Sequence, residues 1–372
     1  MTGRLPGDRL PSAQLLGVDA ARAVALTGMI ATHTLPLVDP DGSESVVGLL
    51  ASGRAAALFA VLAGVGIALS TRGVTDAAAH AAAGAGLLVR GVLVGLLGLA
   101  VVGLRPPVAV ILAYYGLLFV VAIPLLRARA GPLAAGAVVA VVAGPVLSHL
   151  LRTGLPAGPG PQAGLGALAD PGQLLVTLTL SGYYPVLPWT AYLLAGMAVG
   201  RLDLRDTRVA ARLLGGGVLL AGTAAVASAA LRGVVGGELD PSAVAARRYG
   251  TTPTDTWWWL VVDDPHSGTP FDLAHTTGTA LAVLGLALLV AGWSRAAVWV
   301  PAAVGAAPLT LYTLHVSGLG SRPGTGPSTF LVHLVVAVLL GVALRLAGRR
   351  GPLETVVSAP GRALRRRVPV RT

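Results

Sequence analysis

The first apolar stretch of the chain carries three ionisable side chains that could bind an anion and move a proton. In residues 16–36, Asp19 and Arg22 lie near the beginning and His33 lies near the end. At about 100° per residue, the step from Arg22 to His33 makes about three turns, and Asp19 precedes Arg22 by one turn. One helix face would therefore carry all three, with a rise of about 16 Å from Arg22 to His33. Two interpretations stay open: a polar track that handles a ligand, or an interfacial ion pair with a packing histidine.

Further polar and aromatic side chains lie at or near the ends of other apolar segments. The candidate substrate-binding residues are Arg54, Tyr115, Tyr184, Trp189, His266, Tyr312 and His315. Each has a plainer alternative, because an arginine can be interfacial, tyrosines can be bonded in the core, and outer aromatic residues can form a belt. A lone histidine in a helix is more often a hydrogen-bonded structural residue. Two at similar outer depth, His33 and His315, favour a site.

The composition places these residues in a membrane. The chain is 54% hydrophobic and only 12% charged, whereas a soluble protein carries about 25% charged residues. The mean hydropathy is +0.76. We therefore predict an all-α polytopic membrane protein, a bundle of about ten transmembrane helices. The expected spans are 16–36, 53–71, 86–104, 107–126, 131–151, 177–200, 209–231, 272–293, 298–319 and 328–347.

The charge distribution predicts the orientation in the membrane. The 27 basic residues are all arginine, and they gather in loops on one side of this scheme and after the last span. We therefore expect both termini in the cytoplasm, a multi-pass protein of the cell membrane, and a basic tail on the inner leaflet. Nothing in this pattern indicates nucleic-acid binding. Arg4 and Arg9 precede the first apolar run as in a signal sequence, but no cleavage motif follows, so an uncleaved first span is expected.

The loops divide the chain into two halves. Residues 152–176 are rich in Gly and Pro and separate halves at approximately 1–151 and 177–348 within one domain, 1–348, followed by the tail 349–372. The long polar segment 233–271 is expected to form a lid over an outer cavity. Its adjacent Asp263, Asp264 and His266 could orient a polar substrate or hold a cation, but they are a poor metal signature, and no metal is expected. Cysteine is absent, which excludes thiolate chemistry and disulfides.

Five stretches carry a resemblance to a known family: GVDAARAVALTGMIATH, GRAAALFAVLAGVGIAL, AYYGLLF, GYYPVLPWTAYLLAGMAVGRLDL and APLTLYTLHV. The sequence resembles the bacterial DUF418 and YeiB-like membrane proteins, related to heparan-α-glucosaminide N-acetyltransferase. The spacing of Arg22 and His33 is also similar to the first-span motif of the acyltransferase-3 family of membrane O-acyltransferases. The resemblance implies a cytosolic acyl-CoA donor, acetyl-CoA foremost. It also implies an acceptor sugar, glycolipid or cell-envelope component at the outer side.

The resemblance also implies roles for residues of the first span. His33 would act as base or acyl carrier, Arg22 would hold a CoA phosphate, and Asp19 would orient Arg22. The sequence departs from the eukaryotic enzyme, in which the position matching His33 looks to be Asn and the catalytic His comes later, in the following loop. Here that loop, LPLVDPDGSESVVG, holds no His. Either His33 takes over, or the acyl-transfer chemistry differs or is absent.

Two other classes of function compete with this interpretation. A transporter or flippase for a small polar or lipid-linked substrate would also have buried ionisable groups, but it predicts broken helices near mid-membrane. Only Pro185 and Pro188 in the sixth expected span hint at one. A partner-binding scaffold is disfavoured because large soluble segments are nearly absent. The expected partners are the bilayer, the acyl-CoA donor and the outer acceptor, and a homodimer stays open.

Overall fold

The computed structural model describes residues 13–72, 74, 76–155, 158–235, 239 and 250–366, without the side chains of residue 13 and of residues 364–366. The described part is helical, and its only pairing of extended backbone is one isolated bridge between Val38 and Glu44. The predicted all-α class is thus confirmed. Arg4, Arg9, most of 236–249 and the end of the basic tail lie outside the described residues.

Seven helical segments of the described chain are long and apolar enough to cross a membrane, or eight with one bent pair. The seven are α1 (Ala13–Thr34), α2 with α3 (Val46–Ala51, Arg54–Ser70), α4 (Ala77–Val102), α6 (Ala130–Leu151), α9 (Thr207–Val235), α11 (Pro270–Trp293) and α14 (Pro327–Leu346). The bent pair is α12 (Trp299–Gly305) with α13 (Pro308–Ser321). The chain is therefore a multi-pass membrane protein, as expected.

Two of the ten predicted spans were drawn too long. In 107–126 the helix α5 (Leu112–Ala122), continued by the 3-10 turn η1 (Ile123–Leu125), begins only after the pair Pro106–Pro107. In 177–200 the helix α8 (Val186–Gly200) is preceded by the π-turn η3 (Thr177–Ser181) and an irregular break. Proline removes backbone donors at both places, so neither segment forms one straight span. The remaining short elements are α7 (Pro171–Val176), η2 (Leu165–Ala169) and η5 (Trp257–Val261).

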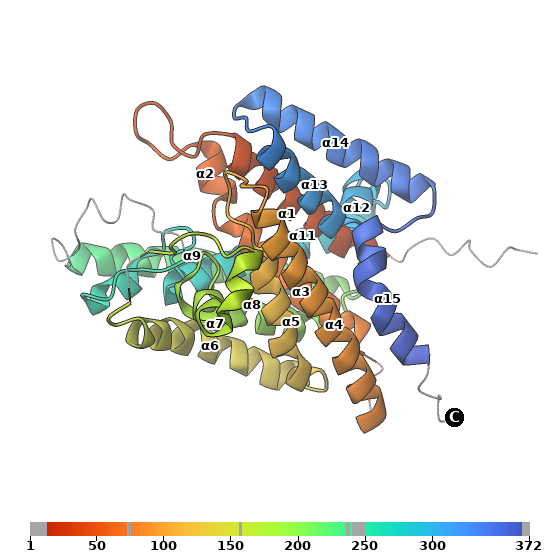
Figure 1. Ribbon diagram of the computed structural model, residues 1–372, viewed down its shortest axis with the longest axis horizontal. Helices are drawn as coiled ribbons and strands as arrows, with labels where there is room; N and C mark the ends of the chain where they lie inside the picture. The colour runs from red at the N-terminus through yellow and green to blue at the C-terminus, as the bar shows by residue number, and fades with distance from the viewer. Residues whose placement is uncertain are drawn as a thin grey trace, which may run out of the picture.

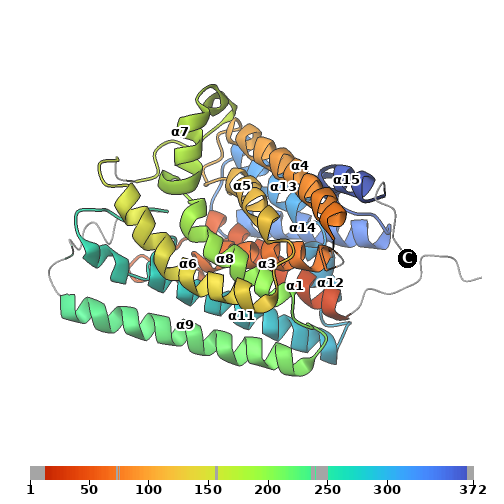
Figure 2. The same cartoon turned by 90° about the horizontal axis from the view of Figure 1, so that it is seen from below.

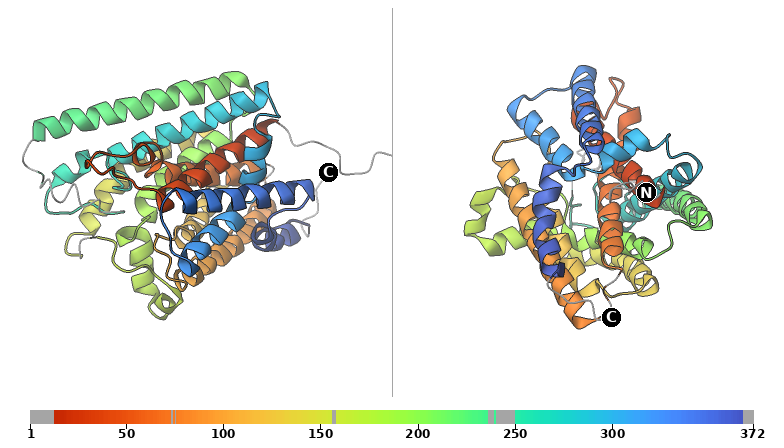
Figure 3. Two further views of the ribbon diagram at one scale, coloured as in Figure 1. Left: turned by 90° about the horizontal axis from the view of Figure 1, so that it is seen from above. Right: turned by 90° about the vertical axis from the view of Figure 1, so that its right-hand side faces the viewer.

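The helices α1 and α3 lie at the centre of the bundle, and α9 and α14 lie at its edges (Figures 1 and 3). Figure 2 shows α9 and α11 running side by side, and their backbones approach closely at Gly217 and Gly278. Helix α3 packs on α8 at Gly196, where a Cβ would overlap the Val61 carbonyl oxygen. Small residues at such crossings let apolar helices associate without a hydrophobic driving force between them.

The ninth predicted span is broken rather than straight. Helices α12 and α13 meet at 72°. Pro308 begins α13, and Gly305 lies so close to α1 that a Cβ there would overlap the Asp19 carbonyl oxygen. The exposed amides of α13 are capped from the far end of the chain, because Glu354 Oε1 accepts hydrogen bonds from Leu309 N at 2.6 Å and Thr310 N at 3.1 Å. The bend therefore creates a polar point inside an apolar bundle.

Glu354 belongs to the last described helix, α15 (Pro352–Arg366), which packs against α4 (Figure 1). Its Val357 is buried, and Gly361 lies against Gly86 of α4. The placement of residues 349–372 on the inner leaflet stays a prediction. The described part of this tail docks on the protein, because its apolar face and the Glu354 cap bind α4 and α13.

Candidate functional site

Two cavities lie along α1, one toward each of its ends. The Arg22 cavity has a volume of about 230 Å³ and is lined by side chains that include Arg22, Arg90, Tyr115, Tyr312 and Glu354. The His33 cavity has a volume of about 370 Å³ and is lined by side chains that include Thr32, His33, Ser52, Gln162, Tyr184 and His266. A constriction of about 30 Å³ shares Tyr312 with the first and His33 with the second. Polar side chains thus follow α1 from one cavity to the other.

Two guanidinium groups face the Arg22 cavity. Arg22 Nη1 lies 2.5 Å from Asp19 Oδ1, one turn earlier on α1, and Gly66 leaves room for the Arg22 side chain. Arg90 comes from α4, and its guanidinium carbon lies 5.0 Å from the ring centre of Phe119. Neither of the two ion pairs among the described residues involves Arg90. This cavity therefore holds one arginine in direct contact with a carboxylate and one that shares the cavity with the Glu354 carboxylate without contacting it.

Arg90 was not among the residues singled out from the sequence as part of a site. The only signal is an arginine inside the 26-residue apolar helix α4. Such a residue needs a polar partner or a watery cavity. Sequence alone could not tell that α4 brings it to the same cavity as Arg22.

Two tyrosines that line the Arg22 cavity are bonded to the backbone. Tyr312 Oη accepts a hydrogen bond from Ile111 N at 3.3 Å, and Tyr115 Oη donates to the Ala56 carbonyl oxygen at 3.5 Å. Both side chains are buried. They hold α5 and α13 against neighbouring segments, and Tyr312 also lines the constriction between the two cavities.

His33 and His266 both line the His33 cavity, and they come from different segments. His33 lies in the last turn of α1, whereas His266 lies in the loop before α11 at a φ of +63°, a left-handed conformation that is uncommon for histidine. The His266 ring is parallel to Trp189, 6.5 Å away, and meets the edge of Tyr184 at 5.5 Å. Burial lowers the pKa of His266 to about 4, so this imidazole is neutral at pH 7.

His33 is also the first ring of a chain of three histidines. His33 Nδ1 lies 3.1 Å from His315 Nε2, and His315 Nδ1 lies 3.0 Å from His333 Nδ1. His315 was expected to bind substrate, but both of its ring nitrogens face other histidines and it lines neither cavity. His333 belongs to α14 and was not among the candidate residues from the sequence.

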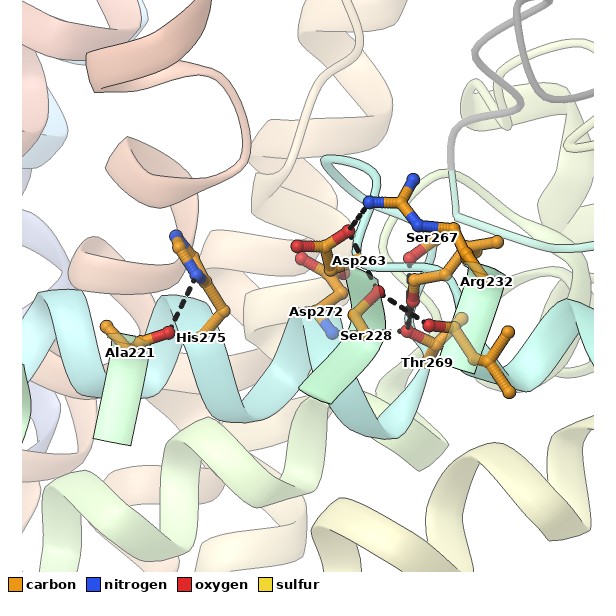
Figure 4. A network of polar contacts seen from close by, with 10 residues as sticks. Ala221, Ser228, Arg232, Asp263, Ser267, Thr269, Asp272 and His275 are labelled. Carbon is orange, nitrogen blue, oxygen red and sulfur yellow. Dashed lines mark hydrogen bonds and ion pairs between the residues drawn. The ribbon is translucent and has the colours of Figure 1, made fainter. Parts of the chain in front are cut away.

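The loop that carries His266 is tied to two helices (Figure 4). Arg232 Nη2 of α9 lies 2.7 Å from Asp263 Oδ1, and the buried Ser228 Oγ lies 3.0 Å from the same oxygen. On the α11 side, Asp272 Oδ2 accepts a hydrogen bond from Gly268 N at 2.9 Å. Asp263 therefore fixes the loop, and among the described residues no group of three or more His, Asp or Glu side chains is placed to hold a metal ion.

Of the two remaining candidate residues, Trp189 packs behind side chains of the His33 cavity, and Arg54 lines a third cavity. Trp189 is almost fully buried behind Tyr184 and His266, so the aromatic-belt interpretation is wrong for it. Arg54 faces a separate groove of about 430 Å³ between α1, α3, α11, α12 and α14, lined mostly by apolar side chains. We call it the Arg54 groove. Ala51 and Ala55 line both this groove and the constriction, so the two are neighbours.

The model of the heparan-alpha-glucosaminide N-acetyltransferase catalytic domain matches residues 15–227 of the 372-residue chain, more than half of it. The matched part runs from α1 into α9 and contains Arg22, His33 and Arg90. His266, His315 and His333 lie after it. No curated protein and no solved structure gives a significant match to the chain.

Proposed function

Because this chain belongs to the family of the heparan-alpha-glucosaminide N-acetyltransferase catalytic domain, a membrane acetyltransferase type, we propose that it transfers an acyl group from acyl-CoA to an acceptor held in the His33 cavity. The family uses acetyl-CoA as donor in general, and acetyl-CoA is the donor we expect here. The observation that carries the proposal is the pair of cavities on α1, with two arginines facing one and a histidine facing the other.

The donor would enter at the Arg22 cavity. Arg22 and Arg90 would bind the phosphate groups of CoA, since a guanidinium donates two parallel hydrogen bonds to phosphate. Asp19 would orient Arg22 through its ion pair. The thioester would then lie beyond the constriction, which must widen to admit the pantetheine arm. Met29 and Tyr312 line the constriction and would move.

The transfer would take place in the His33 cavity. His33 Nε2 has no bonded partner among the described residues, so it can take a proton from an acceptor hydroxyl or amine, or carry the acyl group itself. Neutral His266, across the cavity, would donate a hydrogen bond to the oxyanion that forms at the thioester carbon. Tyr184 and Trp189 would hold the His266 ring in place.

The Arg54 groove supports an acceptor that is borne on a lipid. Its apolar lining suits a hydrocarbon chain. Arg54 Nη1 donates to the Ser52 carbonyl oxygen at 3.2 Å, and neither ion pair of the described residues involves Arg54, so it can meet an anionic head group. A glycolipid in the groove would place its head group near the constriction and His33.

We further propose that the Arg22 end of the bundle is cytoplasmic and that the acceptor binds at the outer face of the cell membrane. Arg201, Arg205 and Arg208 lie at the same end, since Arg205 Nε lies 3.3 Å from Gln14 Oε1 at the start of α1. The excess of arginine at this end supports that orientation.

Binding of acetyl-CoA to the purified protein in nanodiscs tests the donor end. We expect saturable binding that Arg22→Gln weakens and that the matched variant Arg212→Gln, on the exposed face of α9 toward the same end, leaves unchanged. Equal affinity in both variants would place the donor elsewhere.

The bend between α12 and α13 favours one competing function, a transporter or flippase, because broken helices are typical of transport sites. Proteoliposomes with glucosamine inside and labelled acetyl-CoA outside separate the two. N-acetylglucosamine formed in the lumen supports transfer across the membrane. Passage of labelled glucosamine across the membrane without acetyl-CoA supports transport. His33→Gln should abolish the formation of N-acetylglucosamine but not such passage.

A further inference from the structure

The three histidines lead from the His33 cavity to the first third of α14, because His333 lies six residues after Pro327, where α14 begins. They come from three helices, α1, α13 and α14, and their ring nitrogens are 3.1 Å and 3.0 Å apart. The middle ring is buried, whereas His333 is half-buried on α14, one of the most exposed helices. Among the described residues, His333 Nε2 has no partner, and it is not enclosed.

These contacts impose an order on the protons. A neutral imidazole donates with one nitrogen and accepts with the other. His315 has a histidine at each nitrogen, so it can donate to only one of them and must accept from the other. If His33 Nδ1–H donates to His315 Nε2, then His315 Nδ1–H donates to His333 Nδ1. The free lone pair of His33 Nε2 then faces the cavity, and His333 Nε2–H faces outward.

We propose that His33, His315 and His333 form a proton relay between the His33 cavity and water at the Pro327 end of α14, which begins six residues before His333. The proposal rests on the acyl transfer proposed above. His33 Nε2 takes the proton of the acceptor hydroxyl or amine as the acceptor oxygen or nitrogen bonds to the acyl carbon. The Nδ1 proton of His33 passes to His315 Nε2, that of His315 Nδ1 passes to His333 Nδ1, and His333 Nε2 releases its proton to water.

The return of the proton completes the reaction. The acyl carbon–sulfur bond breaks, and its electron pair leaves with the CoA thiolate. His333 Nε2 takes a proton from water and each ring passes one inward, so that His33 Nε2 gives a proton to the thiolate sulfur. One proton has left and one has returned, which matches a balance of acceptor plus acyl-CoA giving acylated acceptor plus CoA thiol. The three rings are then in their starting tautomers.

Occupation of the cavity by the acceptor explains why a relay is useful. An imidazolium in the His33 cavity is unfavourable once the acceptor has displaced water from it, unless a carboxylate pairs with it. Neither ion pair of the described residues involves His33, and the other imidazole of the cavity, His266, is neutral. His315 and His333 therefore act through His33 by taking the charge away from the cavity.

The position of His333 depends on one small residue. A Cβ on Gly318 of α13 would lie 3.1 Å from His333 Cε1. Gly318→Ala should therefore displace the ring without changing any titratable group. Gly222→Ala on α9 is the matched control, because no atom lies within 4 Å of its Cβ position.

The first test does not depend on activity. With histidine labelled by ¹⁵N in nanodiscs, NMR should detect two nitrogen–nitrogen couplings across hydrogen bonds, and His315→Asn should remove both. The chain has 7 histidines, so assignment by single substitutions is practical. Absence of either coupling in the wild-type protein overturns the relay, whatever the enzyme does.

The second test uses acetyl transfer from acetyl-CoA to glucosamine. His333→Gln keeps a hydrogen-bond acceptor for His315 Nδ1–H but cannot pass a proton, so we expect kcat to fall by about tenfold or more with KM unchanged. Added imidazole should restore the His333→Gly variant, and His80→Gln should behave as wild type. Full activity of His333→Gln overturns the relay. Couplings without any transfer by the wild-type protein would refute the acyltransferase proposal and leave the hydrogen-bonded chain standing.

Discussion

Replacement of Arg90 by glutamine should weaken the binding of CoA more than replacement of Arg22. Arg22 is already neutralised by Asp19 at 2.5 Å, whereas neither ion pair of the described residues includes Arg90. A unit charge about 4 Å from a guanidinium interacts by about 4 kcal/mol at an effective dielectric constant of about 20. The cost of desolvating both groups reduces this interaction energy, and a hydrogen bond to a charged group contributes about 1.5–3 kcal/mol net. The expected loss in affinity for Arg90→Gln is therefore about 10- to 150-fold.

Isothermal titration with CoA and with 3′-dephospho-CoA measures this loss and identifies the phosphate. If Arg90 binds the 3′-phosphate, Arg90→Gln weakens CoA strongly and dephospho-CoA little. If it binds the pyrophosphate, both ligands lose equally. Asp19→Asn removes the ion pair that orients Arg22, so it should weaken the binding of both ligands. Unchanged affinity of Arg90→Gln for both ligands, with Arg212→Gln as control, would refute a phosphate site in the Arg22 cavity.

Three further outcomes test the architecture and the pH dependence. Glu354→Gln should lower stability by about 1–2 kcal/mol in thermal unfolding, since it removes the charge that caps α13, and Thr310→Ala should show coupling to it in a double-mutant cycle. Gly196→Ala should prevent α3 and α8 from packing and leave little folded protein in detergent, whereas Gly222→Ala should unfold like the wild type. His266 has its pKa lowered to about 4 in the folded protein from about 6.5 in the unfolded chain, so the unfolded state binds more protons between these values. Stability should therefore fall as the pH falls from 7 to 5, by about 2 kcal/mol, and His266→Gln should remove this part of the dependence.

The helices and the contents of the first span follow from the sequence because they depend on local pattern. Hydropathy over about twenty residues is enough to locate a span, and helical periodicity is enough to place Arg22 and His33 on one face. Interruptions of the predicted spans are harder to locate from the sequence. Pro107 and Pro185 indicate the late starts of α5 and α8. The 72° bend before Pro308 was missed, because many other Gly and Pro residues of the chain cause no break.

The partners of the site residues could not be predicted from one sequence. Arg90 reaches the Arg22 cavity only because α4 packs on α5, and His333 meets His315 only because a short loop returns the chain from α13 to α14. His266 lines the same cavity as His33 because the loop before α11 is tied down by Arg232 and Asp272. Such contacts join positions far apart in the chain, and periodicity carries no information about them.

The docking of α15 makes the Arg22 cavity depend on helices that are far apart in the chain. Arg22 comes from α1, the first described helix, and Glu354, which lines the same cavity, comes from α15, the last described helix. A chain cut between α14 and Pro352 keeps the seven long apolar helices and still lacks one wall of this chamber. Such a truncation would therefore yield an inserted protein without a finished chamber.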